Sequence, residues 1–127
     1  MGCSGNPRST CDSLWVFVVP NENGCGHQTT FALFNVGPSQ VPTVIAAELD
    51  GANYDGANFK KIVYVINVDK IAQSVSDPRL VNTRFELHSV QSGGMAADLL
   101  VASSSGFDPT MGAFSVPARS VSVFVSR

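Results

Sequence analysis

Ten acidic residues are the side chains of this chain with the clearest capacity for chemistry. Two carboxylates held close together can act as general acid and as base or nucleophile. Most of the ten, however, stand beside Gly, Pro, Asn or Ser, where Asp commonly serves turns. They are Asp12, Glu22, Glu48, Asp50, Asp55, Asp69, Asp77, Glu86, Asp98 and Asp108. The pattern favours turn formation over a catalytic pair.

Histidine and cysteine offer the other reactive groups. Glu86 and His88 share a face if they lie on a strand, and we interpret His88 as a cross-strand hydrogen-bonding residue. Cys25-Gly26-His27 puts a thiol beside an imidazole, but such dyads are assembled from residues distant in sequence, and no oxyanion-hole motif accompanies this one. We therefore expect no catalytic residue.

The three cysteines all fall within the first 25 residues: Cys3, Cys11 and Cys25. With His27 they nominally form a Cys3His zinc set, but the chain has no C-x-x-C pair, and their spacings fit no standard zinc ribbon. An odd number of cysteines argues against a closed disulfide framework, although one pair can form in an oxidising compartment. We expect no metal site and no cofactor.

Length and composition predict one domain with an exposed apolar surface. The chain has 127 residues, enough to bury a core, and only 14% of them are charged, against the usual quarter. So little charge leaves an apolar patch on the surface, which often marks a partner's binding site. A net charge of −2 without a basic run excludes the electrostatic footprint of a nucleic-acid-binding protein. We find no membrane span and no signal peptide, and the sequence does not indicate a cellular location.

The end of the chain alternates apolar and polar residues on both sides of Pro117-Ala118, as half-buried β-strands do. Phe114 and Val116 point one way, and Val121, Val123 and Val125 do so after the break. Pro117 is compatible with a strand end because it donates no backbone hydrogen bond. These residues predict two antiparallel strands, Ala113–Val116 and Ser120–Ser126.

Further short strands are predicted at intervals of about ten residues, and no segment makes a convincing helix. They are Leu14–Val19, Thr29–Asn35, Val44–Leu49, Ile62–Val68, Ala72–Ser76 and Arg84–Val90, while Ala96–Ala102 is ambiguous and Ser103–Gly106 is expected to be loop. Ile62–Val68 is apolar on both faces and should lie at the centre of a sheet. Asp50–Asn58, which reads DGAN-Y-DGAN, is a loop with two Asp-Gly turn signals. The fold class is all-β, an antiparallel β-sandwich of about seven to eight strands.

Four segments resemble one known family. They are Phe34–Pro42 (FNVGPSQVP), Ile62–Asn67 (IVYVIN), Phe85–Gln91 (FELHSVQ) and Phe114–Val125 (FSVPARSVSVFV). In this order they resemble the C-terminal domain of pullulanase-type α-1,6-glucosidases, the starch-debranching enzymes. The resemblance covers residues from about 29 to 127; residues 1–28 match no family and are expected to form an arm with one added strand. Val36, Thr43 and Ser89 depart from the family's pattern.

The resemblance implies a β-sandwich that packs against a catalytic barrel and carries no catalytic residue, so we expect no enzyme activity. A barrel of about 250 residues could not fit in this chain. The partner would be the catalytic domain of a debranching enzyme, and a detached domain would cover its apolar patch by forming a homodimer.

Two other functions remain open at this stage. The first is an α-glucan-binding module, since sugars stack on exposed aromatic rings. The predicted carbohydrate contacts are Tyr54, Trp15, Asn53, Asp55 and Asn58. Tyr54 is the better exposed candidate, while Trp15 and Tyr64 also fit core packing. The second is a protein–protein interaction sandwich, because this architecture hosts many functions.

Overall fold

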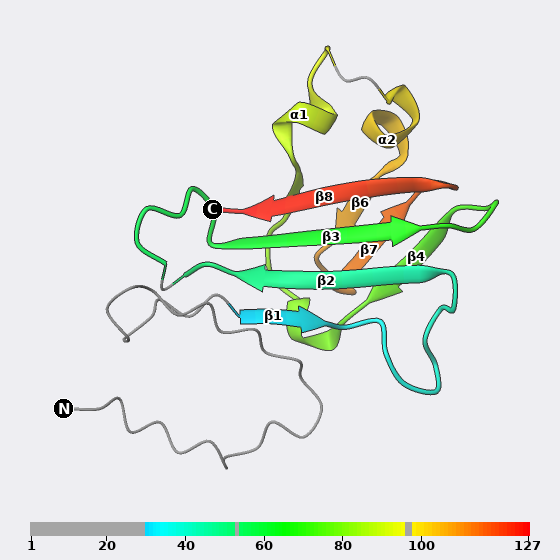
Figure 1. The fold of residues 1–127 in the computed structure, drawn as a ribbon, viewed down its shortest axis with the longest axis horizontal. Helices are drawn as coiled ribbons and strands as arrows, with labels where there is room; N and C mark the ends of the chain where they lie inside the picture. Colours follow the sequence, from blue (N-terminus) through cyan, green and yellow to red (C-terminus); the bar gives the residue numbers. More distant parts are fainter. Residues whose placement is uncertain (1–29, 53, 96–97) are drawn as a thin grey trace.

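The larger of two antiparallel sheets has five strands in the order β1-β2-β3-β8-β5 (Figure 1). The strands are β1 (Thr30–Leu33), β2 (Val44–Asp50), β3 (Lys61–Asn67), β8 (Ser120–Ser126) and β5 (Glu86–Leu87). The computed structural model describes residues 30–52, 54–95 and 98–127, so the predicted strand Leu14–Val19 lies outside the described residues. The apolar Ile62–Val68 segment is confirmed as a strand, and β3 occupies the middle of the sheet.

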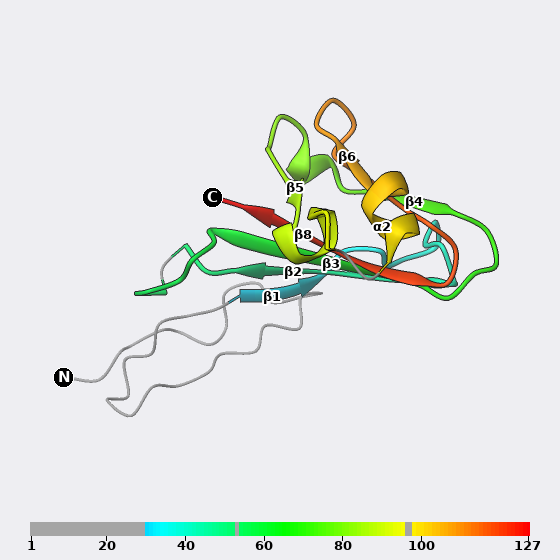
Figure 2. The same cartoon turned by 90° about the horizontal axis from the view of Figure 1, so that it is seen from above.

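The second sheet has three strands in the order β4-β7-β6 and packs on one side of the first (Figure 2). Its strands are β4 (Gln73–Ser76), β7 (Ala113–Val116) and β6 (Gly106–Asp108). In the part of the chain that the structure describes, three short helical segments connect the strands: η1 (Pro78–Leu80), α1 (Ser89–Ser92) and α2 (Leu99–Ser104). The predicted all-β sandwich is thereby confirmed.

Phe114 of β7 is the centre of the interior. Its ring centroid lies 4.6 Å from that of Phe107, 4.8 Å from Phe124 and 5.4 Å from Phe85. Val63 and Val65 of β3 belong to the same buried cluster. Because Phe124 comes from the first sheet and Phe114 from the second, these two rings join the layers. Aromatic packing of this kind dominates core energetics.

The inner face of β8 differs from the apolar series that the sequence suggests. Ser122 and Phe124 point into the interior; Ser122 is 0% exposed, and its hydroxyl is satisfied by a 2.7 Å hydrogen bond with the hydroxyl of Ser105. Val121 and Val123 instead belong to the opposite face of the sheet, in register with Ile66 and Tyr64. The strand prediction is correct, but the apolar triplet is not the core-facing side.

The segment Arg84–Val90 is mostly not a strand. Only Glu86 and Leu87 pair with β8, after which the imidazole of His88 accepts a hydrogen bond from Val90 N and caps α1. The expected cross-strand role of the His88 side chain is therefore wrong. The ambiguous segment Ala96–Ala102 overlaps the helix α2. The predicted loop Ser103–Gly106 is wrong at both of its ends, because Ser103 and Ser104 belong to α2 and Gly106 begins β6.

Candidate functional site

The outer face of the five-stranded sheet is apolar across four strands. Its cross-strand rows are Phe31–Leu49–Ile62–Val125, Leu33–Ala47–Tyr64–Val123 and Ile45–Ile66–Val121. The alternate residues of the same strands, such as Val44, Val63 and Phe124, fill the interior. Ile45 is 54% exposed and Val121 44% exposed. We call this set of residues the outer apolar face.

The outer face of the three-stranded sheet is polar by contrast. Ser74, Ser76 and Ser115 are exposed there, and Asp108 lies beside them on β6. An antiparallel sheet whose outer face meets water shows this alternation of apolar inside and polar outside. The five-stranded sheet breaks the rule on β1, β2, β3 and β8. The asymmetry indicates that the outer apolar face is a contact surface.

The β2–β3 loop stands at one end of the outer apolar face and is fixed by its own backbone. Gly51 N donates to Lys60 O at 2.8 Å, which closes the loop. Within it, Tyr54 N donates to Gly51 O at 2.9 Å and Ala57 N to Tyr54 O at 3.1 Å. Gly56 follows with φ +84°, a left-handed conformation that Gly adopts without strain. The two Asp-Gly signals of the sequence therefore encode a tight double turn.

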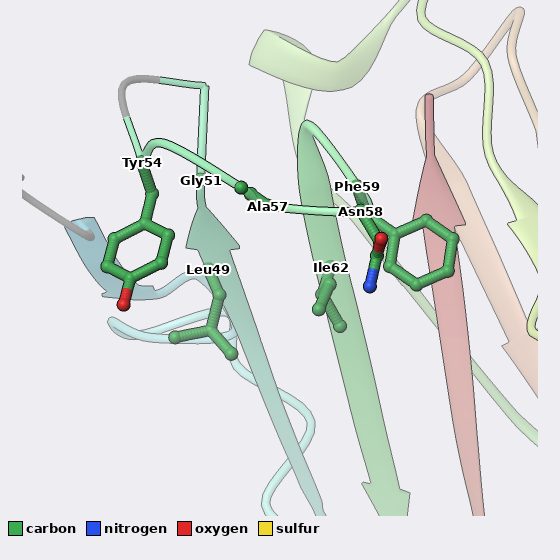
Figure 3. Close-up of a pocket in the computed structure, with 8 residues that line it drawn as sticks. Leu49, Gly51, Tyr54, Ala57, Asn58, Phe59 and Ile62 are labelled. Carbon is green, nitrogen blue, oxygen red and sulfur yellow. The ribbon is translucent and has the colours of Figure 1, made fainter.

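A groove of about 420 Å³ lies under this loop, with Tyr54 on one side and Asn58 and Phe59 on the other (Figure 3). Leu49 and Ile62 form its apolar floor. The structure thus brings together two of the predicted carbohydrate contacts, Tyr54 and Asn58. Tyr54 is 52% exposed.

Of the other predicted carbohydrate contacts, none that the structure describes lines the groove. Asp55 is exposed on the loop and is not part of the lining. Trp15 and Asn53 lie outside the described residues. Tyr64 is half-buried, and its ring stacks on that of Phe31 with centroids 6.4 Å apart. Tyr64 therefore belongs to the outer apolar face.

A second hollow, of about 380 Å³, adjoins the groove across Phe59 and Ile62, which line both. His88, Val90 and Gln91 of the α1 segment form its far side. The Phe59 ring meets the His88 ring edge-on at 5.5 Å and the Arg127 guanidinium at 5.5 Å. Neither Phe59 nor Gln91 was predicted as a residue of this site: Phe59 stands in no sequence pattern, and Gln91 was noted only as the last residue of the family-like segment Phe85–Gln91.

Several acidic residues among those described serve turns, as predicted, and others form ion pairs. A hydrogen bond from the Gln73 side chain is the main cause that lowers the pKa of Asp69, which also accepts from Thr43. The Thr110 hydroxyl and backbone N–H lower the pKa of Asp108 in the same way. Glu48 bonds Lys61 at 2.9 Å. No carboxylate lines either hollow of the outer apolar face.

Neither a metal cluster nor a membrane-spanning helix occurs among residues 30–52, 54–95 and 98–127. They hold no group of three or more His, Cys, Asp or Glu side chains placed to bind a metal ion. Nor does any helix among the described residues have the length and apolarity to cross a membrane.

Comparison with known proteins decides the family. The family model described as alpha-1,6-glucosidases, pullulanase-type, C-terminal, matches residues 13–127. This chain belongs to that family. Pullulanase 1, chloroplastic, of Arabidopsis thaliana is 33% identical to it over 98 residues, which cover 72% of this chain and 10% of that protein. The chain thus spans about a tenth of this curated relative's length.

Solved pullulanase structures share the fold. The maltotriose complex of PulA from Klebsiella pneumoniae superposes with a TM-score of 0.60 at 21% identity, covering 78% of this chain and 11% of that one. PulA from Klebsiella oxytoca gives 0.59 at 19% identity, covering 76% and 9%. At these identities the likeness establishes the β-sandwich and nothing finer.

Polar residues of the family-like motifs hold loops together. The Asn35 amide accepts from Val41 N and donates to Val41 O, both at 2.9 Å. Asn67 bonds the Pro117 carbonyl, and Gln91 bonds the backbone of β8. Each motif of the pullulanase C-terminal family thus encodes structural contacts here.

Proposed function

We propose that this chain is a non-catalytic accessory domain that packs its outer apolar face against the catalytic domain of a pullulanase-type enzyme. Membership of the C-terminal family supports the kind of partner. The catalytic carboxylates would then belong to the partner. The contribution of this chain would be to cover apolar surface on the partner and so stabilise it.

The observation that carries the proposal is the contrast between the two outer faces. Serines cover the three-stranded sheet, whereas Ile45, Ile66 and Val121 make one unbroken apolar row across the five-stranded sheet. Ile45 and Val121 of this row are exposed and Ile66 is half-buried, and an exposed apolar patch of this kind often marks an interaction site. It lies on β2, β3 and β8, and β3 pairs with both of its neighbours along its whole length, so the row needs no rearrangement to bind.

Binding to a pullulanase-type enzyme that lacks its own C-terminal domain tests the proposal. Isothermal titration and thermal unfolding of the truncated enzyme should show a complex and a raised Tm. Ile45→Lys should weaken binding by at least about tenfold, because it places a charge in the centre of an apolar contact. Ser74→Lys, on an exposed strand position of the other sheet, is the matched control and should bind as the wild type does.

Two results would contradict the accessory role. One is no binding by the wild-type chain to the truncated enzyme. The other is self-association that Ile45→Lys abolishes, again without enzyme binding, which would make the outer apolar face a homodimer interface instead.

The groove under the β2–β3 loop supports a second candidate function, α-glucan binding. Tyr54 and Phe59 offer ring surfaces to the apolar face of a sugar, and the Asn58 amide offers hydrogen bonds to its hydroxyls. Protein recognition of sugars combines such apolar and polar contacts. We infer a short maltooligosaccharide as the ligand class because the family acts on α-glucans.

Calorimetric titration with maltotriose tests the second candidate directly. Tyr54→Ala and Asn58→Ala should each reduce the affinity, while Asp55→Ala, next to the groove but outside its lining, should leave it unchanged. Absence of heat at millimolar maltotriose would reject glucan binding at this groove. The same outcome would leave the accessory role intact, because that role depends on Ile45 and Val121.

A further inference from the structure

Strand β8 has an edge that the sheet covers only in part. On one side β8 pairs with β3 along its whole length. On the other side, β5 pairs only with Val125 and Phe124, because β5 is two residues long. The edge-facing backbone groups of Val121 and Val123 thus lie beyond the end of β5. An uncovered strand edge is a template for pairing with another chain.

The side-chain amide of Gln91 occupies this part of the edge. Its Oε1 accepts from Val123 N at 2.7 Å, and its Nε2 donates to Val121 O at 2.9 Å. In a neighbouring antiparallel strand, these two bonds would be made by the C=O of one residue and the N–H of the residue two positions further on. The Gln91 amide therefore takes the place of two backbone groups of a neighbouring strand.

The backbone around Gln91 keeps the amide in this position. His88 N donates to Val123 O at 2.8 Å, which extends the β5 pairing by one bond. Gln91 N donates to His88 O at 2.8 Å, which fixes the first turn of α1. The backbone thus leaves the sheet after His88, and the side chain of Gln91 still contacts β8.

We propose that Gln91 is an edge guard, a residue that blocks the open edge of β8 against pairing with β8 of a second copy of this chain. A second copy is the partner always at hand, and antiparallel pairing of two identical strands obeys two-fold symmetry. Val121 and Val123 also belong to the outer apolar face, so edge pairing would join two apolar faces into one. This role of Gln91 does not depend on binding to an enzyme or to a sugar.

Hydrogen exchange of the unmodified chain gives the first test. The amide of Val123 should be protected although it lies past the end of β5, because Gln91 accepts its hydrogen bond. In Gln91→Ala at micromolar concentration, exchange at Val123 should accelerate by about tenfold, the value of one lost hydrogen bond. Ser92→Ala, an exposed neighbour on α1, is the matched control and should exchange as the wild type does.

Raising the concentration of Gln91→Ala tests the pairing itself. Sedimentation should show a dimer at a concentration where Ser92→Ala does not self-associate beyond the wild type, and the Val123 amide should regain protection in it. Adding Val121→Pro to Gln91→Ala should abolish the dimer, because proline removes an edge-facing N–H. Gln91→Glu keeps an acceptor for Val123 N but loses the donor to Val121 O, and should lie between the wild type and Gln91→Ala.

Clear results would overturn the proposal. These are an unprotected Val123 amide in the wild type, or a folded Gln91→Ala that exchanges Val123 at the wild-type rate and forms no additional dimer at high concentration. If Gln91→Ala fails to fold by circular dichroism, the wild-type exchange and Gln91→Glu measurements decide.

Discussion

The side-chain amide of Asn67 donates to the carbonyl oxygen of Pro117 at 2.9 Å from a position that is 1% exposed. It also donates to Ile71 O at 2.9 Å, while its Oδ1 accepts from Asp69 N at 2.9 Å. One buried side chain thus joins the end of β3, the turn that follows it, and the Pro117 break before β8. Since its hydrogen bonds are made inside the protein, removing it leaves several backbone groups without partners.

Asn67→Ala should therefore lower the free energy of unfolding by about 2–3 kcal/mol, the cost of buried backbone groups that lose their partner. Urea denaturation measures this value directly. Ser74→Ala, an exposed strand position, should change it by less than about 0.5 kcal/mol. An Asn67→Ala curve that superposes on the wild type would show that water replaces the amide at no cost.

The strands were predictable where the alternation of residue types and the distance between turn residues both indicated a strand. The predicted bounds of β7 and β8 are those observed, because Pro117 separates two clean alternations. The inward side of β8 was not predictable, because both faces of the sheet are covered by small or apolar side chains. Ser122 lies inside on the same strand face as Phe124, and Ser105, seventeen residues earlier, supplies the hydrogen bond that its buried hydroxyl needs.

The prediction of a strand over Arg84–Val90 was mostly wrong for a related reason. Apolar and polar residues alternate through the whole segment, but the strand ends before His88, which caps α1. The side chain of Gln91 then makes a hydrogen bond to β8 that a continued strand would have made. Such a substitution depends on the edge of β8, which no local pattern reveals. Within the groove, Tyr54 and Asn58 were predictable from the loop's composition. Phe59 was not, because its place follows from packing against His88 and Arg127.

Glycine is required at position 112 for two reasons that can be separated by experiment. Gly112 has φ +59°, and a Cβ there would lie 2.5 Å from Asp77 O. Gly37 also has a positive φ, +95°, but a Cβ there would meet nothing within 4 Å. Gly37→Ala should cost about 1–2 kcal/mol from backbone strain, and Gly112→Ala several kcal/mol, because it adds a backbone clash. Chemical denaturation of the two variants makes the comparison, and equal losses would contradict the clash.

Phe114→Leu should test how far the interior depends on one ring. The substitution keeps the residue apolar but removes the ring faces that Phe107 and Phe124 contact. We expect a loss of about 1–3 kcal/mol and a lower Tm, because the void between the two sheets cannot close fully. Leu33→Ala is the comparison variant, because Leu33 belongs to the outer apolar face and not to the interior. It should lower the free energy of unfolding of the isolated chain by less than Phe114→Leu does. A larger loss for Leu33→Ala than for Phe114→Leu would show that the outer apolar face contributes more to stability than the interior does.

The Asp77–Arg79 pair gives the fold a dependence on acid pH. Burial of the Asp77 carboxyl by itself raises its pKa, but hydrogen bonds from the Arg79 guanidinium and backbone N–H outweigh it and leave the pKa below the ordinary value of 3.8. A carboxyl whose pKa is lower in the folded state contributes stability above its unfolded pKa. That contribution is lost as the pH falls through the folded pKa.

Asp77→Asn should therefore be less stable than the wild type at pH 7, and the difference should shrink below about pH 4 as Asp77 of the wild type takes up a proton. Urea denaturation of both proteins between pH 7 and pH 2 measures the difference. Asp69 and Asp108, whose pKa values are also lowered, are present in both proteins and cancel. A stability difference that stays constant down to pH 2 would mean that Asp77 acts through packing and capping of η1, and not through its charge.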